Sequence, residues 1–555
     1  MPVAATHVGH QVCGQCHAQI EQRWRGSHHD LAMQPPTDAS VAGDFNDARF
    51  TYAGVTSTFS RRDGKFMVRT DGPDGRLADF EVKYTFGISP LQQYLVELPG
   101  GRLQALGIAW DTRPRAQGGQ RWFHLYPGQS VTHADELHWT RPGQNWNYMC
   151  AECHSTGVRK NYDANTRTFA TAYAEVNVAC EACHGAGSNH VAWARKEAGR
   201  TDDATNGLMV TLADRRGVTW TINAETGNAQ RTPATRVGHE VEVCGRCHAR
   251  RGQFSEEETS RRFLGETHRV ALLEDRLYYP DGQIRDEVYE YGSFRQSKMF
   301  HRGVTCSDCH DPHSGKLRAP GSQVCLACHS AQKYTPTTHH FHPAGSRGAD
   351  CLGCHMPTTT YMVVDPRHDH SFRVPRPDLS ITLGVPNACT RCHADRPAAW
   401  AAKQVEAWYG HIPRGYQRYA EALGASGAPG SGGLLEAVAR DGDQPAIARA
   451  SAIARLTPAS SPGAGDLLRS ALQDKDPLVR RAAVGALGSV EPVQRGERLA
   501  PLLDDPVRGG RMEAARLLAG APRERLTEAQ RGALDRAYAE YVAAERFNAD
   551  RPESH

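Results

Sequence analysis

The chain has 555 residues, more than one domain usually holds, so we expect two to four domains. No stretch approaches 18 consecutive apolar residues, which argues against a membrane-spanning helix. The formal charge of +3 comes without any run of basic residues, and this argues against a nucleic-acid-binding protein.

The pattern C-x-x-C-H occurs eight times and uses all 16 cysteines. It is the attachment signature of c-type haem, in which the two thiols add to the haem vinyl groups and the histidine reaches the iron. C-x-x-C pairs also build zinc sites, but zinc does not require a histidine directly after the second cysteine in every copy. We therefore expect eight covalently bound c-type haems, each with its iron. Their propionates would make the oxidised holoprotein acidic, at about −5.

The predicted haem-attaching residues are Cys13, Cys16, Cys150, Cys153, Cys180, Cys183, Cys244, Cys247, Cys306, Cys309, Cys325, Cys328, Cys351, Cys354, Cys389 and Cys392. The predicted proximal iron ligands are His17, His154, His184, His248, His310, His329, His355 and His393. We number the motifs, and the haems they would hold, 1 to 8 in chain order.

Residues 1–44 form the first haem segment. His28 and His29 follow about three helical turns after His17, so they point away from the first haem and could serve another. Residues 45–130 contain no motif, and over 78–86 apolar and polar residues alternate, which predicts a half-buried strand. Asp63-Gly64 lies between two strand-like runs and predicts a hairpin. We expect an antiparallel β insertion that covers haems or serves as a docking surface.

Residues 131–395 are predicted to form the multihaem core, with seven haems. A small hairpin is expected within 207–232. Motifs 5 to 8 lie within 306–393, so their haems are expected to pack closely. Pro312 breaks the helix after His310, which allows His313 to turn toward an adjacent haem.

Residues 396–555 contain no cysteine and carry helical patterns rich in Ala, Leu and Arg. Pro445, Pro477 and Pro506 each precede an Ala/Leu-rich helix, in two cases directly after an Asp that can cap it. This pattern resembles HEAT repeats, with a plain helical bundle as the alternative. Stacked helix pairs offer extended binding surfaces, so we predict that this tail binds a protein partner and can be removed without loss of haem.

A bis-histidine haem needs a second histidine on the far side of its iron. Of the 27 histidines, 19 lie outside the motifs, so the supply exceeds the demand. The predicted distal ligands are His29, His138, His190, His268, His313, His340, His342 and His370, with His124 competing with His138 and with His7, His10, His239 and His301 in reserve.

The chain resembles the multihaem cytochrome c superfamily that includes pentahaem nitrite reductase, hydroxylamine oxidoreductase and their tetrahaem electron-transfer relatives. The matching pieces are Trp24…Ser27-His28-His29, Cys180…His184-Gly185…His190, Cys306…His310-Asp311-Pro312-His313, and Cys351…His355-Met356-Pro357 followed by His370. More closely, it is similar to bacterial multihaem cytochromes with HEAT and tetratricopeptide tails, in which 544–553 would lead into further repeats. Two features depart from the enzymes: all eight motifs end in His rather than Lys, and no tyrosine can be assigned to a haem cross-link.

We expect a mainly α fold with β insertions, in which short helices and loops surround the haems. The predicted function is electron transfer through mostly bis-histidine haems, because a six-coordinate iron has no open site. The alternatives are an oxidoreductase with one open haem acting on a small nitrogen or sulfur compound, and a scaffold or haem-wire subunit of a redox complex. The expected partners are redox proteins. Haem attachment chemistry predicts a periplasmic or extracellular location, although residues 1–6 do not resemble a signal peptide.

Overall fold

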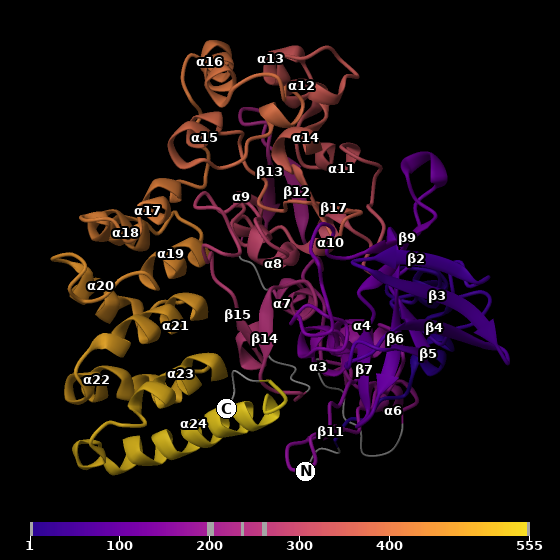
Figure 1. Cartoon of the computed structure of the whole chain (residues 1–555). Helices are drawn as coiled ribbons and strands as arrows, with labels where there is room; N and C mark the ends of the chain where they lie inside the picture. Colours follow the sequence, from indigo (N-terminus) through magenta and orange to yellow (C-terminus); the bar gives the residue numbers. More distant parts are fainter. Residues whose placement is uncertain (1–3, 197–204, 235–237, 258–262, 552–555) are drawn as a thin grey trace.

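The computed structural model describes residues 4–196, 205–234, 238–257 and 263–551. Figure 1 shows a β sheet on one side of the molecule and an arc of tail helices on the other. The segments that carry the haem motifs lie between them and extend to the top of the view.

The β insertion is a nine-stranded antiparallel sheet in the order β2-β3-β4-β5-β6-β8-β9, with β1 paired to β5 and β7 paired to β6. At the turn between β3 and β4, Asp63 and Gly64 have φ angles of 51° and 76°, as a tight hairpin turn requires. Phe59 and Trp122 stack with their ring centroids 3.6 Å apart in the core of this sheet. The predicted β insertion and its hairpin are present. The strands are β1 (Met33–Gln34), β2 (Ala48–Tyr52), β3 (Val55–Arg62), β4 (Lys65–Asp71), β5 (Leu77–Phe86), β6 (Leu91–Leu98), β7 (Arg102–Ala105), β8 (Ile108–Asp111) and β9 (Arg121–His124).

The motif segments fold as single helical turns, because C-x-x-C places its two thiols three residues apart on one helix face. In motif 1 the backbone N–H of His17 donates to the Cys13 carbonyl at 2.9 Å, and motifs 2, 4, 5, 6 and 8 repeat this bond at 2.9–3.1 Å. The motif helices are α1 (His10–Gly14), α4 (Ala151–His154), α5 (Cys180–His184), α7 (Glu240–Gly245), α10 (Cys306–Cys309), α11 (Gln323–Leu326), α14 (Cys351–His355) and the 3₁₀ turn η5 (Cys389–Arg391).

Short hairpins and helices connect the motifs. The hairpin expected within 207–232 is present as β12 (Thr219–Ile222) and β13 (Ala229–Thr232). The other hairpins are β10 (Tyr162–Asp163) with β11 (Thr168–Phe169), β14 (Arg251–Gln253) with β15 (His268–Val270), and β16 (Thr358–Tyr361) with β17 (Asp365–His368). The other helices named below are α8 (Tyr289–Phe294), α13 (Thr337–His340) and α15 (Pro377–Leu383).

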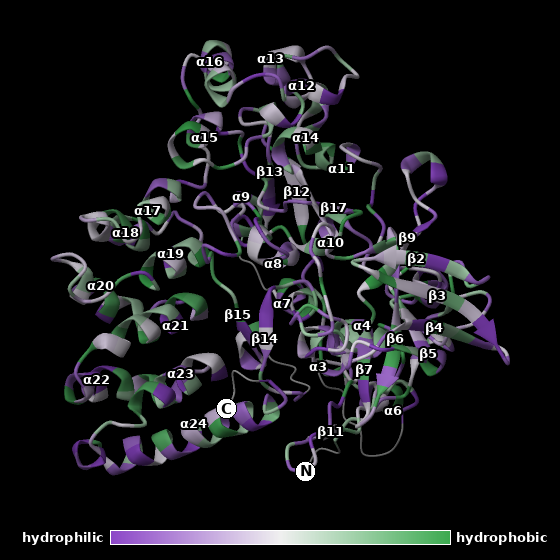
Figure 2. Cartoon of the chain, viewed as in Figure 1, coloured by the Kyte–Doolittle hydropathy of each residue, from purple (hydrophilic) through white to green (hydrophobic). Residues whose placement is uncertain are grey.

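The tail is a stack of antiparallel helices. Asp476 caps α21 by accepting a hydrogen bond from the Leu478 N–H at 2.9 Å, and Pro477 occupies the first turn. In Figure 2 the tail helices carry apolar and polar residues on different faces. Many of the apolar residues, among them Ile447, Ala483 and Leu518, are fully buried. The tail helices are α16 (Ala398–Tyr409), α17 (Ala420–Gly424), α18 (Ser431–Arg440), α19 (Ala446–Ile453), α20 (Ala464–Ala471), α21 (Pro477–Ala486), α22 (Pro492–Leu499), α23 (Arg508–Leu518) and α24 (Glu528–Phe547).

The tail shares one hydrophobic core with residues 241–304 of the motif region. Polar contacts cross the same boundary: the Leu273 N–H donates to Ser451 at 2.9 Å, and Arg295 forms an ion pair with Asp476 at 2.5 Å. At the far end, Lys160 pairs with Asp550 at 2.8 Å. The tail therefore packs on the motif region along its length.

The expectation of a mainly α fold holds only in part, since the β insertion and several hairpins accompany the helices. None of the helices in the described ranges is long and apolar enough to cross a membrane.

Candidate haem-binding sites

All 16 cysteines are free thiols, so none is used in a disulfide. Cys16 of motif 1 and Cys392 of motif 8 are exposed, and the other 14 are partly buried. Free cysteine pairs, each followed by a histidine on one helical turn, are the donor set that covalent haem requires.

Five motif histidines face a second imidazole at a distance that suits an iron between them. An iron bonded to two imidazole nitrogens at about 2 Å each holds the two ring centroids about 6 Å apart. The five pairs are His17–His190 at 6.2 Å, His29–His248 at 6.4 Å, His310–His370 at 6.5 Å, His339–His355 at 6.2 Å and His342–His393 at 6.3 Å. These side chains fit haems 1, 4, 5, 7 and 8.

Motif 3 has a histidine neighbour of its own. Burial, and then electrostatic contact with His313, lowers the pKa of His184 to about 4. His313 follows Pro312 at the end of motif 5, so the turn predicted there brings it toward another motif. Of the histidines around His184, His313 has the largest electrostatic effect on it, so it is the candidate second ligand of haem 3.

The orientation of the ligand rings is fixed through Nδ1. His355 donates to the Arg373 carbonyl at 2.8 Å, and His190 and His370 donate to the carbonyls of Asn206 and His368 at 2.8 and 2.9 Å. A ring whose Nδ1–H is held by a carbonyl keeps Nε2 unprotonated and able to bind metal.

His248 of motif 4 differs because its Nδ1 faces a carboxylate. Glu290 accepts this hydrogen bond at 2.9 Å. Burial alone would lower the pKa of His248, but the bond to Glu290 raises it to about 9. Burial would likewise raise the pKa of Glu290, and His248 lowers it to about 2. A carboxylate behind a metal-bound histidine makes that ligand a stronger electron donor.

Three of the histidines predicted as distal ligands do not face a motif histidine. Both ring nitrogens of His138 are bonded, to Thr140 at 2.8 Å and to Asp71 at 3.1 Å. His268 is bonded to Thr267 and to Glu152, both at 2.8 Å, and lies 1% exposed beside motif 2. His340 is bonded to the Thr335 carbonyl at 3.0 Å and accepts from the His342 N–H. In each of these side chains, both ring nitrogens have hydrogen-bond partners within the protein.

His339 takes the position that His340 was expected to fill. Both lie in α13, and only the direction of each side chain on that turn separates them. The sequence therefore predicts that this segment supplies a ligand, but it does not show which of the two histidines does so.

Two motif histidines have no imidazole opposite them in the described ranges. His154 of motif 2 donates to the Ala32 carbonyl at 3.0 Å and meets the edge of Phe86 at 5.5 Å. His329 of motif 6 is bonded to Asn228 at 2.9 Å and meets the edge of Tyr334 at 5.6 Å. The number of histidines in the chain does not predict this.

Comparison with known families supports the haem assignment. Residues 298–334 match the family described as a doubled CXXCH motif, and residues 116–185 match the cytochrome c554 and c-prime family. Residues 431–519 match HEAT repeats, as the tail sequence predicts. No curated protein matches the chain. A solved structure described as outer cell wall cytochrome OcwA aligns at 17% identity over 86% of this chain and 99% of its own, with a TM-score of 0.48.

These two partial matches and the haem motifs support a multihaem c-type cytochrome. The remaining contacts of the cytochrome describe how its motifs adjoin one another. Four pairs of thiols are neighbours, and in each pair the second thiol is the main cause that raises the pKa of the first one named: Cys13 with Cys180, Cys247 with Cys153, Cys244 with Cys306, and Cys325 with Cys351.

Further motifs of the cytochrome adjoin through electrostatic contact. Cys183 helps to raise the pKa of Cys244. Burial, and then charges that include Cys328, raises the pKa of Cys309 to about 11, and Cys354 is raised to about 11 by burial followed by Cys389 and Cys392. The contacts therefore run 1–3–4–5–6–7–8, and motif 2 joins motif 4. Figure 1 shows α7, α10, α11 and α14 following one another from the middle to the top of the molecule.

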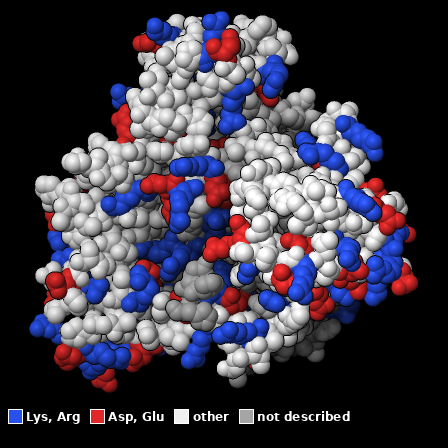
Figure 3. Space-filling model, in the orientation of Figure 1, with Lys and Arg blue, Asp and Glu red and all other residues white. Residues whose placement is uncertain are grey.

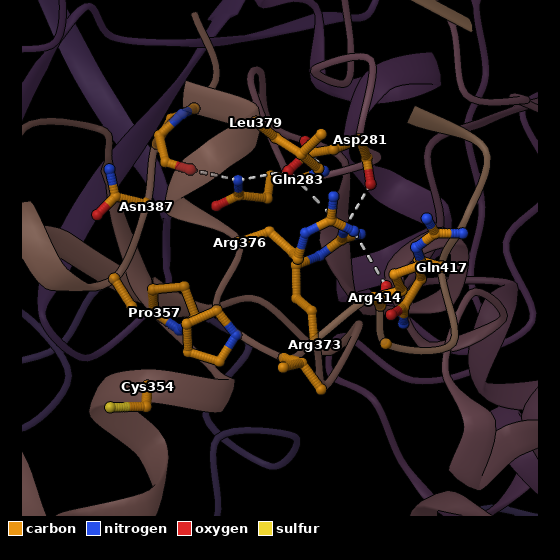
Figure 4. Close-up of a pocket in the computed structure, with 15 residues that line it drawn as sticks. Asp281, Gln283, Cys354, Pro357, Arg373, Arg376, Leu379, Asn387, Arg414 and Gln417 are labelled. Atoms are coloured by element: carbon orange, nitrogen blue, oxygen red, sulfur yellow. Dashed lines mark hydrogen bonds and ion pairs between the residues drawn. The ribbon is translucent and has the colours of Figure 1, made fainter. Parts of the chain in front are cut away.

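A pocket opens beside motif 7 of the cytochrome, with Cys354 at its edge and Arg373 near its centre (Figure 4). The buried Arg373 guanidinium donates to Ser371 at 2.7 Å and to Gln296 at 2.8 Å, and it also donates to the Asp281 carbonyl. Since its carbonyl accepts from His355, Arg373 anchors the proximal histidine of motif 7 to the motif region. Gln417, from the segment leading into α17, donates to the Ser371 carbonyl at 2.8 Å and ties the tail to this anchor.

Proposed function

We propose that this chain is an exported electron-transfer protein that holds eight c-type haems in a line with one branch. The observation that carries the proposal is the continuous order of motif contacts from motif 1 to motif 8. Every link joins cysteines of two motifs that lie near enough to affect each other's pKa, and the haems would be attached at these cysteines. Neighbouring haems held this closely can exchange electrons without a mobile carrier.

The two ends of the line are the motifs with exposed cysteines. Cys16 belongs to motif 1 and Cys392 to motif 8. Electrons can therefore enter near one end and leave near the other, while the intervening motifs stay enclosed. On the face in Figure 3, acidic and basic side chains are interspersed over the β insertion, and basic side chains gather between the insertion and the tail. Mixed charge of this kind suits transient docking of redox partners.

Six irons have two histidines in this proposal: His17 with His190, His184 with His313, His248 with His29, His310 with His370, His355 with His339, and His393 with His342. The remaining two irons, those of haems 2 and 6, have one histidine each, His154 and His329. The histidines of the chain hold the irons, and the bound haems supply the redox chemistry.

Export follows from the attachment chemistry, because thioether-linked haem of this type is matured outside the cytoplasm. Mass spectrometry of protein produced with haem-attachment machinery tests the number of haems. We expect a gain of eight haem masses that survives denaturant, and haem that is extracted by acid and acetone would overturn the assignment.

Rapid mixing tests electron transfer. All eight haems should be reduced by a small redox protein or dye without any added substrate, and reoxidised by an acceptor of higher potential. A protein whose haems stay oxidised unless a specific substrate is supplied would contradict the proposal. The low-spin signals of the oxidised protein should account for six irons, as the histidine pairs require.

A further inference from the structure

One short segment carries the second ligands of two haems. His339 faces His355 of motif 7 with ring centroids 6.2 Å apart, and His342 faces His393 of motif 8 with centroids 6.3 Å apart. The two imidazoles lie three positions apart in the chain, within the segment 339–342. A shift of this segment would therefore change the ligation of both haems at the end of the proposed line.

Phe341 makes the turn that sends these imidazoles toward different motifs. Its N–H donates to the Thr337 carbonyl at 2.7 Å and ends α13, and its φ of 57° and ψ of 26° are left-handed. Glycine is the usual residue at such a helix end, because a side chain makes this conformation costly. With phenylalanine here, contacts from elsewhere in the fold must hold the turn.

The end of α16 supplies these contacts, and Figure 1 shows α16 beside α13 at the top of the molecule. The Phe341 ring stacks on Trp408 with centroids 4.9 Å apart and planes 5° apart. Trp408 also meets the His342 ring in an edge contact, with centroids 5.8 Å apart and planes at 74°. The Tyr409 hydroxyl donates to the His339 carbonyl at 2.5 Å. Two neighbouring residues of one helix thus hold three of the four residues of the segment.

His342 is also confined by its other neighbours. A methyl group at Gly348 would lie 2.2 Å from the His342 ring, so the ring packs directly on that glycine. Near the other end of α16, the centroid of the Trp400 ring lies 5.0 Å from that of His393. The helix therefore contacts both imidazoles of haem 8, one through each tryptophan.

We propose that Trp408 is a positioning residue for the last two haems, and that it keeps the segment 339–342 in place as the shared source of their distal ligands. This inference rests on the proposed function, because it uses the ligand pairs of haems 7 and 8. It goes further by placing α16, the first helix of the tail, with the haem region. Haems 7 and 8 then form a unit whose distal ligands move together.

EPR of the oxidised holoprotein tests the proposal, because the signal of a low-spin haem depends on how its two imidazole planes are oriented. His339→Ala and His342→Ala identify the signals of haems 7 and 8, since each variant should lose one of them. Trp408→Leu should keep eight haem masses and shift both identified signals, because the stack that holds Phe341 is lost. Trp408→Phe keeps an aromatic ring for this stack and should restore both signals.

Two smaller changes separate the two haems. Tyr409→Phe removes only the hydroxyl that donates to the His339 carbonyl, so it should shift the haem 7 signal alone. Gly348→Ala places a methyl group in the space of the His342 ring, so it should shift the haem 8 signal alone.

Trp400→Leu is the matched control, because Trp400 lies on the same helix but its ring meets His393. It should leave the haem 7 signal in place. The proposal is overturned if Trp408→Leu leaves both signals unmoved, or if Trp400→Leu shifts the haem 7 signal equally. Should Trp408→Leu fail to fold, Tyr409→Phe decides, and an unmoved haem 7 signal in that variant counts against the proposal.

Failure of this inference is distinguishable from failure of the proposed function. If His339→Ala or His342→Ala loses no low-spin signal, the ligand pairs of the proposed function are wrong. If both signals are present and assigned but do not respond to Trp408→Leu, the ligand pairs stand and only the role of Trp408 is refuted.

Discussion

At the scale of single residues, the eight attachment motifs are readable from the sequence and the distal ligands only in part. A motif cysteine or histidine is identified by its neighbours in the chain. A distal histidine is identified by which motif the fold brings opposite it, as His190 is brought opposite His17 across 173 positions of sequence. His138 and His268 have the right side chain for a ligand, but Asp71 and Glu152 bind their ring nitrogens instead.

The adjacent pair His339 and His340 gives a direct test of ligand assignment. Only His339 faces His355, with centroids at 6.2 Å and planes 13° apart. His339→Ala should convert one low-spin haem to a high-spin or water-ligated form in the oxidised protein. His340→Ala, the matched control, should leave the low-spin count unchanged, because both of its nitrogens are bonded within its own loop. EPR of the two variants measures this, and the reverse pattern would reassign haem 7.

Glu290 should set the potential of haem 4. Its carboxylate accepts the Nδ1–H of His248 at 2.9 Å and gives that ligand more negative character, which stabilises the ferric state. Glu290→Gln should therefore raise the potential of one haem by about 60 mV, equivalent to a tenfold change in a one-electron equilibrium.

Spectroelectrochemistry of the holoprotein measures that shift. Glu97→Gln is the control, since it removes the same charge from an exposed position on β6. An equal shift in both variants would show a general charge effect instead of an effect on the ligand.

At the scale of elements, the sequence predicts turns and helix caps well, because neighbouring residues make the interactions that these features need. The Asp63-Gly64 turn and the Asp476-Pro477 cap depend on neighbouring residues, so the sequence indicates them directly. Packing between distant elements has no such signature. Nothing in the tail sequence shows that α19 and α21 bury their apolar faces against residues 270–294 of the motif region.

The last tail helix is held to the motif region by a buried ion pair. The side chains of Lys160 and Asp550 are 4% and 1% exposed, and the Lys160 ammonium also donates to the Phe547 carbonyl. Asp550→Ala leaves that ammonium buried without its anion, which should lower the free energy of unfolding by about 3 kcal/mol.

Lys160→Met combined with Asp550→Ala should recover most of this loss, because no charge is then left unpaired. Thermal unfolding monitored by circular dichroism compares the three proteins. A single variant as stable as the parent would show that the end of the tail is not anchored here. Equal losses in the single and double variants would show that packing, and not charge, is what matters.

At the scale of the whole molecule, the order of haems differs from the order of motifs. Motif 3 lies between motifs 1 and 4, and motif 2 lies to the side of motif 4. The residues between motifs 1 and 2 form the β insertion, and its sheet packs around α3 (Trp146–Met149) and α4. This arrangement keeps motif 2 beside the sheet, while α1 packs against α5 of motif 3.

The line and its branch can be separated by removing one haem at a time. Cys306→Ala with Cys309→Ala removes haem 5 from the middle of the line, and Cys150→Ala with Cys153→Ala removes haem 2 from the branch. A photosensitiser on Arg396→Cys, an exposed position close to motif 8, injects electrons at one end. Haem 4 reports their arrival, because its imidazole planes are 70° apart and should give a strongly anisotropic low-spin EPR signal, unlike the near-parallel pairs.

After a flash and rapid freezing, the haem 4 signal should disappear in the parent and in the protein without haem 2. It should persist in the protein without haem 5, since electrons from haem 8 then have no continuous path to haem 4. Both variants lose two thioethers and one haem, so each controls for the general effect of that loss. Equal transfer in all three proteins would mean that haem 5 is bypassed, and a block caused by loss of haem 2 would place it in the line.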